Sequence, residues 1–428
     1  MRLEVGSIII RDIRFAEKTE VKNSVLYINK DELSRVAGDD ERIKSVEVFL
    51  ARPGEPVRII PVKDVVEPRC KADGPGGIFP GFIAGVEQVG SGRTHVLKGT
   101  AVVTTGKIVG FQEGIIDMSG IGAEYTPFSK THNIVIKADP IDGIKQHEHE
   151  VVVRLAGLRA ANYLGLAGKD LQADEIKAYE TKPLLAQVGE YPGLPKVVYV
   201  YMLQTQGLLH NTFYYGIDVK QILPTYMYPT EAMDGAIISG NCVSACDKNP
   251  TYIHENSPVI EDLYAEHGKT INFLGCVITN ENVTLADKER SSNMTAKLCE
   301  LLGADAVIIS EEGFGNPDAD LVMNCNKIEK LGIKTVLITN EYAGQDGASQ
   351  SLADSTPLGD ACITAGNANE IITLPPMDTV IGYPETANII AGGWDGSLHP
   401  DGSITAEIQV ITGSTNELGY GYLSAKAV

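Results

Sequence analysis

The second half of the chain alternates short apolar runs with segments of helical periodicity, and this alternation limits the possible folds more than any other feature. Strands that alternate with helices form parallel sheets whose two faces are covered by the helices. Functional loops of such sheets lie at the carboxyl ends of the strands. We therefore predict a mainly parallel, doubly wound α/β sheet. The expected elements are strands at residues 271–278, 306–309 and 335–339 and helices at residues 293–302 and 319–331, with Ser291 and Ser292 as cap candidates for the first helix.

The first 145 residues show a different pattern. Short apolar runs, such as Val46–Leu50 and Val57–Val62, are separated by Gly, Pro and charged turns. This pattern is typical of a compact β-rich or α+β unit. We therefore expect a β-rich N-terminal domain over residues 1–145 and an α/β region over residues 146–428.

A helix is expected at the start of the α/β region, over residues 146–165, where apolar side chains recur on one face. Its first turn contains His147 and His149. Residues two apart on a helix face different directions, so these two histidines would not converge on one metal ion. We expect this turn to be charged and solvated.

An Asn–Cys peptide bond follows an apolar run just past the midpoint of the chain, between Asn241 and Cys242. The preceding Gly240 permits backbone conformations that a side chain would forbid, so the bond can sit in a strained turn. From there the Cys242 thiol could attack the Asn241 carbonyl and move the acyl group from nitrogen to sulfur. Elimination would then cut the chain and leave dehydroalanine, whose imine tautomer hydrolyses to a pyruvoyl group. By itself the dipeptide favours a buried structural cysteine in a turn after a strand, because free cysteines are usually packing residues.

The run from Ser239 to Tyr252, SGNCVSACDKNPTY, resembles the processing site of the proprotein of component B in the glycine reductase complex of amino-acid-fermenting anaerobes. The resemblance is long and collinear. It implies a precursor that is cut between Asn241 and Cys242, with Cys242 becoming the pyruvoyl group of the C-terminal fragment, residues 242–428. Further stretches that resemble the family are residues 52–63, 90–99, 111–118, 201–210 and 286–292.

The resemblance also implies an activity. The chain would be the substrate-binding subunit of an oxidoreductase complex that reductively removes the amino group of its substrate, with the amine activated by the pyruvoyl carbonyl. The attacking selenolate or thiolate would come from a separate selenoprotein subunit of component B, because this chain has no selenocysteine and no Cys-x-x-Cys pair. Glycine is the first choice of substrate, sarcosine the second and betaine the third, since the quaternary nitrogen of betaine cannot form an imine.

Other polar residues near the Asn–Cys bond are further site candidates. Cys246 could be a second thiol of the site or an alternative processing residue, although a packing role is favoured. Asp247 and Lys248 could orient a carboxylate or protonate a leaving amine, but they also suit the turn before Asn249-Pro250. His210 could carry a proton during elimination or lie hydrogen-bonded in the core.

Composition excludes several classes of function. The formal charge of −20 opposes binding to nucleic acid or to anionic lipid. No apolar run is long enough to span a bilayer, and we expect a cytoplasmic protein without membrane insertion. Seven scattered cysteines indicate neither a disulfide framework nor a structural zinc site. We expect no metal and no nucleotide: the glycine cluster at residues 313–318 ends in Asp318, whose charge would oppose a pyrophosphate, and it reads as a helix-capping loop.

A function of another class also fits the sequence. The chain could remain uncut and act as a scaffold or binding subunit that docks the catalytic selenoprotein, with Cys242 in a structural role only. The number of bands on denaturing electrophoresis separates the two possibilities.

Overall fold

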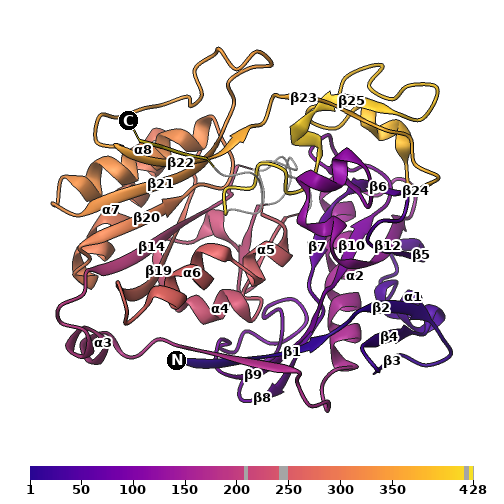
Figure 1. Cartoon of the computed structure of the whole chain (residues 1–428), viewed down its shortest axis with the longest axis horizontal. Coiled ribbons are helices and arrows are strands. Elements are labelled where there is room, and N and C mark those ends of the chain that lie inside the picture. The colour runs from indigo at the N-terminus through magenta and orange to yellow at the C-terminus, as the bar shows by residue number, and fades with distance from the viewer. Residues whose placement is uncertain (207–210, 241–248, 419–423, 428) are drawn as a thin grey trace.

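A seven-stranded, mainly parallel sheet forms the centre of the C-terminal half (Figure 1). The computed structural model describes residues 1–206, 211–240 and 249–418 and the backbone of residues 424–427. Five strands of the large sheet are parallel, and an antiparallel strand closes each edge. Their order is β17 (Thr225–Met227), β19 (Asn272–Asn280), β14 (Lys196–Leu203), β20 (Ala306–Ser310), β21 (Lys334–Glu341), β22 (Ala361–Asn367) and β26 (Ser424–Ala427).

Helices cover both faces of this sheet because the side chains of its strands alternate between two hydrophobic cores. In β14, Val198 and Val200 pack on one face with residues of α7 and α8. Tyr199 and Tyr201 face the opposite way, into the core that contains residues of α5 and α6. The helices are α1 (Lys30–Ala37), α2 (Gln146–Leu166), α3 (Leu184–Glu190), α4 (Pro229–Met233), α5 (Thr251–Glu255), α6 (Pro258–Glu266), α7 (Leu285–Leu302) and α8 (Asn316–Glu329), with 3₁₀ turns η1 (Ile121–Tyr125), η2 (Pro127–Ser129), η3 (Val219–Gln221), η4 (Pro384–Asn388) and η5 (Ile408–Val410).

The N-terminal part consists of several small mixed sheets (Figure 1). Helix α2 packs against them, and Ala156, Ala160 and Leu164 of α2 belong to their core. In strand order these sheets are β13 (Glu175–Glu180), β1 (Arg2–Ile9), β9 (Gly92–Lys98), β8 (Arg69–Asp73); β5 (Ile43–Ala51), β12 (His132–Pro140), β10 (Thr100–Thr105), β7 (Asp64–Val66); β11 (Gly114–Asp117), β6 (Val57–Val62), β24 (Thr379–Gly382); and β2 (Asp12–Phe15), β4 (Val25–Ile28), β3 (Glu20–Lys22). Two further small sheets come from later segments of the chain: β16 (Ile217–Asp218), β15 (Phe213–Tyr214), β18 (Ile237–Ile238); and β23 (Ile371–Leu374), β25 (Ile404–Glu407).

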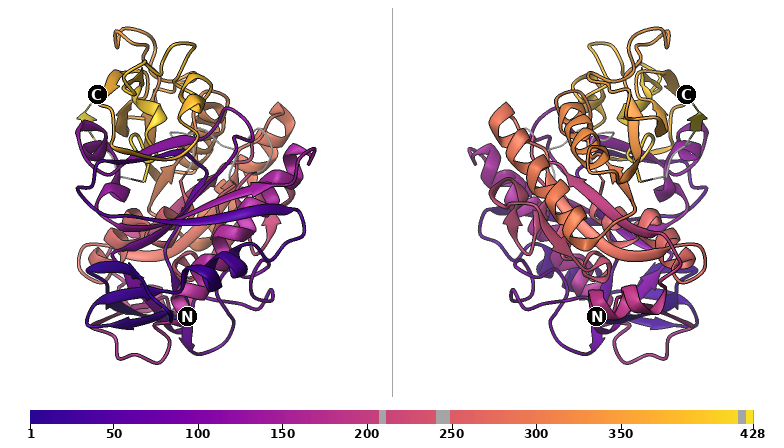
Figure 2. Two further views of the ribbon diagram at one scale, coloured as in Figure 1. Left: turned by 90° about the vertical axis from the view of Figure 1, so that its right-hand side faces the viewer. Right: turned by 90° about the vertical axis from the view of Figure 1, so that its left-hand side faces the viewer.

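The predicted fold class, a β-rich N-terminal unit followed by a mainly parallel doubly wound sheet, is confirmed. Segments far apart in the sequence nevertheless share sheets. Strand β14 lies between β19 and β20, and β24 pairs in parallel with β6. Strands β23 and β25 lie at the opposite end of the molecule from the N-terminus in both side views (Figure 2). The division at residues 145/146 remains a proposal for the domain organisation.

Two local predictions were wrong. Helix α7 begins at Leu285, with Thr284 as its N-cap, so Ser291 and Ser292 lie inside it; Ser292 donates to the Lys288 carbonyl, as serines within helices do. The first turn of α2 is exposed at Gln146, His147 and Glu148, as predicted, but not at His149. His149 is buried against the N-terminal sheets, with 7% of its surface exposed. No helix among the described residues is long and apolar enough to cross a membrane.

The first prediction concerns a buried ion pair that joins β6 to β11 and to the C-terminal segment. Arg58 donates to both carboxylate oxygens of Asp117, at 2.6 and 2.8 Å, and to the Pro375 carbonyl at 2.8 Å. Removing one partner leaves an uncompensated buried charge. We expect Arg58→Ala to lower the free energy of unfolding by about 3–5 kcal/mol in urea titrations. Lys18→Ala, which breaks an exposed pair with Glu20, should cost less than about 1 kcal/mol. Equal costs would contradict the structural role of Arg58.

The second prediction concerns His149. Burial, with a smaller contribution from the charge of Lys63, lowers the pKa of His149 to about 4. As pH falls below about 6.5, the unfolded chain binds a proton that the folded chain cannot accept, so stability is lost between about pH 6.5 and 4. His149→Gln should remove this part of the pH dependence, on the order of 2–3 kcal/mol, from unfolding titrations at a series of pH values. The exposed His147→Gln should leave the wild-type dependence in place.

Candidate functional site

Polar residues gather where three central strands of the large sheet end. Gln204 and Thr205 follow β14, Glu281 follows β19, and Glu312 follows β20 by two residues. All four side chains are buried. Because these strands are parallel, their carboxyl ends meet at one edge of the sheet, where α/β proteins bind their ligands.

Glu312 connects three segments of the chain. One carboxylate oxygen accepts hydrogen bonds from the backbone amide of Gln204 at 2.8 Å and from the Thr212 hydroxyl at 3.0 Å. The other oxygen accepts from the backbone amide of Asn249 at 2.9 Å. Glu312 is fully buried, so water does not compete with these donors. The carboxylate therefore fixes the point at which residues 241–248 rejoin the described chain.

Thr251 connects the other end of that segment to the N-terminal region. Its hydroxyl accepts from the Ser239 amide at 3.0 Å and donates to Asp64 at 2.7 Å. The Thr251 amide also donates to Asp64, at 3.0 Å. Gly240, which follows Ser239, is buried as well. The chain thus enters and leaves residues 241–248 at two positions that α5 and Glu312 hold in the protein interior.

We refer to Glu312, Asn249, Thr251 and Asp64, with their hydrogen bonds, as the buried frame. A buried histidine lies beside this frame. His254 Nδ1 and the Tyr201 hydroxyl share a hydrogen bond of 2.5 Å. Burial raises the pKa of Tyr201 well above its ordinary value, so the hydroxyl is protonated and donates to Nδ1. A neutral His254 then carries its proton on Nε2, which lies 3.6 Å from a Glu312 oxygen. Nε2 has no hydrogen-bond partner among the described residues, so this nitrogen is available to exchange a proton with a group placed beside it.

Two further carboxyl groups, those of Glu281 and Glu311, are buried at the same edge. Burial is the main cause that raises the pKa of each well above its ordinary value. Glu281 accepts a hydrogen bond of 2.9 Å from the Glu312 amide. The second oxygen of Glu281, one oxygen of Glu311, the Thr205 hydroxyl and the Asn249 side-chain nitrogen have no hydrogen-bond partner among the described residues. Such a concentration of unpaired buried polar atoms indicates a site that receives a polar group.

The site residues predicted from the sequence lie next to frame residues in the sequence, but they are outside the residues that the structure describes. They are Asn241, Cys242, Cys246, Asp247, Lys248 and His210.

Sequence reasoning missed the residues of the frame itself. One signal was present: Glu281 and the Glu311-Glu312 pair follow predicted strands closely, and acidic residues at the carboxyl ends of parallel strands often belong to sites. Asp64 and His254 gave no such signal, because neither lies at the end of a predicted strand of the large sheet.

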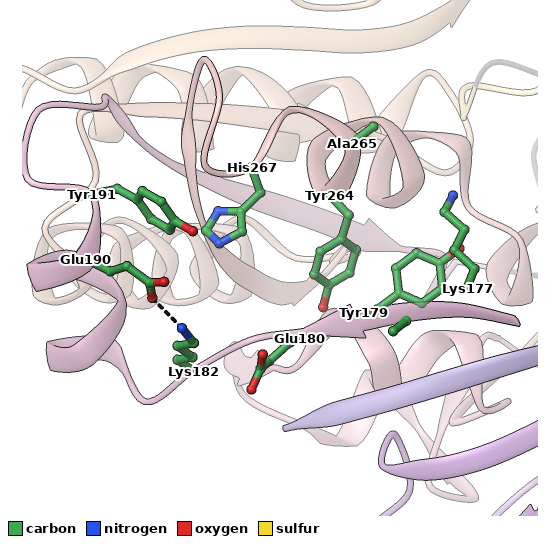
Figure 3. Close-up of a pocket in the computed structure, with 10 residues that line it drawn as sticks. Lys177, Tyr179, Glu180, Lys182, Glu190, Tyr191, Tyr264, Ala265 and His267 are labelled. Atoms are coloured by element: carbon green, nitrogen blue, oxygen red, sulfur yellow. Dashed lines mark hydrogen bonds and ion pairs between the residues drawn. The ribbon is translucent and has the colours of Figure 1, made fainter.

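A separate hollow of about 230 Å³ lies at the other edge of the sheet (Figure 3). Tyr191, Tyr264 and His267 line it, and Lys182 forms an ion pair of 2.6 Å with Glu190 beside them. His267 accepts from the amide of Phe273, near the amino end of β19, at 3.0 Å. Because the hollow lies at the amino ends of the strands, we do not assign it to the site built around Glu312.

The fold and this edge of the sheet define an α/β protein with a buried polar site around an internal segment of its own chain. The family model for "Glycine/sarcosine/betaine reductase component B subunits" matches residues 1–426, and the chain belongs to this family.

Curated relatives match the whole chain. It is 65% identical over 428 residues to "Glycine reductase complex component B subunits alpha and beta" of Acetoanaerobium sticklandii, with 100% of each chain covered. Identity is 66% over 426 residues to the protein of the same name from Peptoclostridium acidaminophilum, and 58% over 426 residues to "Sarcosine reductase complex component B subunit alpha" of that organism, again with both chains covered in full. No solved structure matches the chain.

The site analysis predicts a large stability cost for loss of the Glu312 carboxylate. Glu312→Ala leaves three buried donors without an acceptor, at a cost of roughly 1–3 kcal/mol each if none finds a new partner. We expect the free energy of unfolding in urea to fall by about 3 kcal/mol or more, with faster hydrogen exchange at the Asn249 amide. Glu312→Gln should cost less, because its side-chain oxygen still accepts hydrogen bonds.

Glu300→Ala is the matched control, since Glu300 is exposed on α7, and should change stability by no more than about 0.5 kcal/mol. If Glu312→Ala behaved like this control, Glu312 would not hold the three segments together.

Proposed function

We propose that this chain is the precursor of the α and β subunits of component B of a glycine reductase, and that it cuts itself between Asn241 and Cys242. The observation that carries the proposal is full-length identity of 65–66% to two relatives named as such subunits. The buried frame supports it, because it fixes the described residues on either side of the Asn–Cys bond.

The proposed cut proceeds in balanced steps. The Cys242 sulfur attacks the Asn241 carbonyl carbon, the C–N bond breaks as the C–S bond forms, and the thiol proton is transferred to the freed amine nitrogen of residue 242. Loss of the α-hydrogen of residue 242 to a base then breaks its Cβ–S bond, which leaves a thiocarboxylate on Asn241 and dehydroalanine at residue 242. Water hydrolyses the imine tautomer to the ketone and releases ammonia.

Residues of the frame have distinct tasks in this proposal. Glu312 and Thr251 hold the two ends of the segment, which limits the conformations of the scissile bond. His254 is the proton carrier, since its Nε2 has no hydrogen-bond partner among the described residues. The unpaired side-chain nitrogen of Asn249 is a donor that fits the oxygen of a small carbonyl group. The pyruvoyl group would supply an electrophilic carbonyl that draws electrons from a substrate amine.

The rest of the assignment follows the relatives. We propose glycine as the substrate, ahead of sarcosine, because identity to the sarcosine reductase subunit is lower, at 58%, and betaine remains third for the chemical reason given above. A selenoprotein subunit would supply the attacking nucleophile within the reductase complex, and the cytoplasm is the proposed location. An uncut scaffold subunit is the alternative of another class.

The sheet topology has a consequence for the cut protein. Strand β14 belongs to the fragment of residues 1–241, whereas β19 and β20 on either side of it belong to residues 242–428. Strands β6 and β24 are divided in the same way. Separating the fragments would expose the hydrophobic core and break both sheets, so they should stay together after cleavage.

The proposal predicts that purified wild-type protein gives two bands on denaturing electrophoresis and one species on native size exclusion. Cys242→Ala, which lacks the attacking thiol, should give a single full-length band. The smaller wild-type fragment should resist Edman sequencing, because a ketone replaces its terminal amine, and intact mass should show the same change.

Two further variants sharpen this test. Cys246→Ala keeps the Cys242 thiol and should cleave as the wild type does. His254→Gln should slow cleavage by about 10²-fold or more if the imidazole carries the proton. Cleavage in Cys242→Ala would contradict the self-cutting mechanism, and a wild-type chain that stays whole at full turnover would favour the scaffold.

A further inference from the structure

A cavity of about 460 Å³ opens at the carboxyl ends of β14 and β19. One wall comes from the η3 turn, which contains Lys220, and the other from the start of α7, which contains Asp287 and Arg290. Thr205 and Glu281 line the cavity from the strand ends. Its size suits a small molecule with space for a second reactant.

The two walls are fixed to each other through one side chain. The Asn280 side-chain nitrogen donates to the carbonyls of Val219 and Ile222, at 3.2 and 2.9 Å. Its side-chain oxygen accepts from the Ser291 hydroxyl of α7 at 2.7 Å. Asn280 is 3% exposed. The cavity is therefore formed before any ligand arrives, which lowers the entropic cost of binding.

The polar atoms of the cavity differ between its floor and its mouth. At the floor, the Thr205 hydroxyl and one oxygen of Glu281 have no hydrogen-bond partner among the described residues, although their side chains are 2% and 1% exposed. At the mouth, Arg290 forms an ion pair with Asp287, whereas the exposed Lys220 ammonium has no ion pair with any described residue. The floor thus offers oxygen atoms, and the mouth offers an excess of positive charge.

We propose that this cavity binds the substrate as an amino-acid zwitterion, with its carboxylate toward Lys220 and Arg290 and its amine toward Thr205 and Glu281. The proposal rests on the proposed function and adds the place and orientation of the substrate. An ammonium group provides the donors that the floor oxygens lack, and a carboxylate provides the partner that Lys220 lacks.

Hydrogen bonds connect the floor of the cavity, where the substrate amine is proposed to lie, to the buried frame. Glu281 accepts from the amide of Glu312, and the Glu312 carboxylate accepts from the amide of Asn249. Two hydrogen bonds therefore connect the floor to Asn249, the first described residue after the segment that contains the Asn–Cys bond.

The experiment measures binding without chemistry. Full-length Cys242→Ala protein, which cannot form the carbonyl, is dialysed to equilibrium against radiolabelled glycine. Lys220→Gln and Thr205→Val, each added to this background, should weaken glycine binding about tenfold. Lys297→Gln is the matched control, since Lys297 is exposed on α7 and does not line the cavity, and it should bind as the parent does.

Competing ligands test the orientation. Acetate, which has only the carboxylate, should lose affinity in Lys220→Gln but not in Thr205→Val, and methylamine should show the reverse. Circular dichroism melting confirms that each variant is folded. Absence of saturable glycine binding to the parent, or equal binding by Lys220→Gln and Lys297→Gln, would overturn the proposal.

Failure of this proposal and failure of the proposed function are separate results. Cleavage is scored on the wild-type chain by electrophoresis. A cleaved wild type combined with Lys220→Gln binding equal to that of Lys297→Gln rejects the cavity alone. An uncut wild type combined with Lys220-dependent glycine binding rejects self-cleavage and retains the cavity.

Discussion

The buried Glu312 carboxylate is the interaction on which the rest of the site depends. Its donors come from the end of β14, from Thr212 and from Asn249. A single carboxylate that accepts from three segments keeps their relative positions only if none of the donors is lost to water, and complete burial ensures this. The same burial raises the pKa of the neighbouring Glu281 and Glu311 well above its ordinary value, because an ionised carboxyl group loses its hydration in the protein interior.

The large sheet and its helices were predictable from the sequence because they depend on local patterns. The strand predicted at residues 306–309 is β20, and the glycine after residue 302 ends α7 in a left-handed conformation, with φ of +71°. The start of α7 was misplaced since Ser291 and Ser292 have the residue types of caps, whereas the actual cap, Thr284, lies a full two turns earlier. Residue type alone does not tell a cap from a serine that bonds back to its own helix.

The site could be predicted only in part, for a different reason. A resemblance to a known family pointed to Asn241 and Cys242, and the position of Glu312 after a strand could have been inferred from the parallel sheet. The contact between Thr251 and Asp64 joins residues 187 positions apart, and no periodicity or motif encodes a pairing across that distance. His254 likewise contacts Tyr201 of β14 and Glu312 of the loop after β20, two segments that are distant from it in the sequence. Contacts of this kind follow from the complete fold.

The interleaved topology also gives a reason why one precursor would be made instead of two chains. Strand β14 is completed on both sides by strands of the later segment, so neither part can form the large sheet alone. As a single chain, the two parts meet at a high effective concentration, and the sheet forms before any cut. A cut in the segment that the frame holds between Gly240 and Asn249 breaks none of the strand pairings of the sheet. The proposed chemistry at the Asn–Cys bond would thus act on a protein that is already folded.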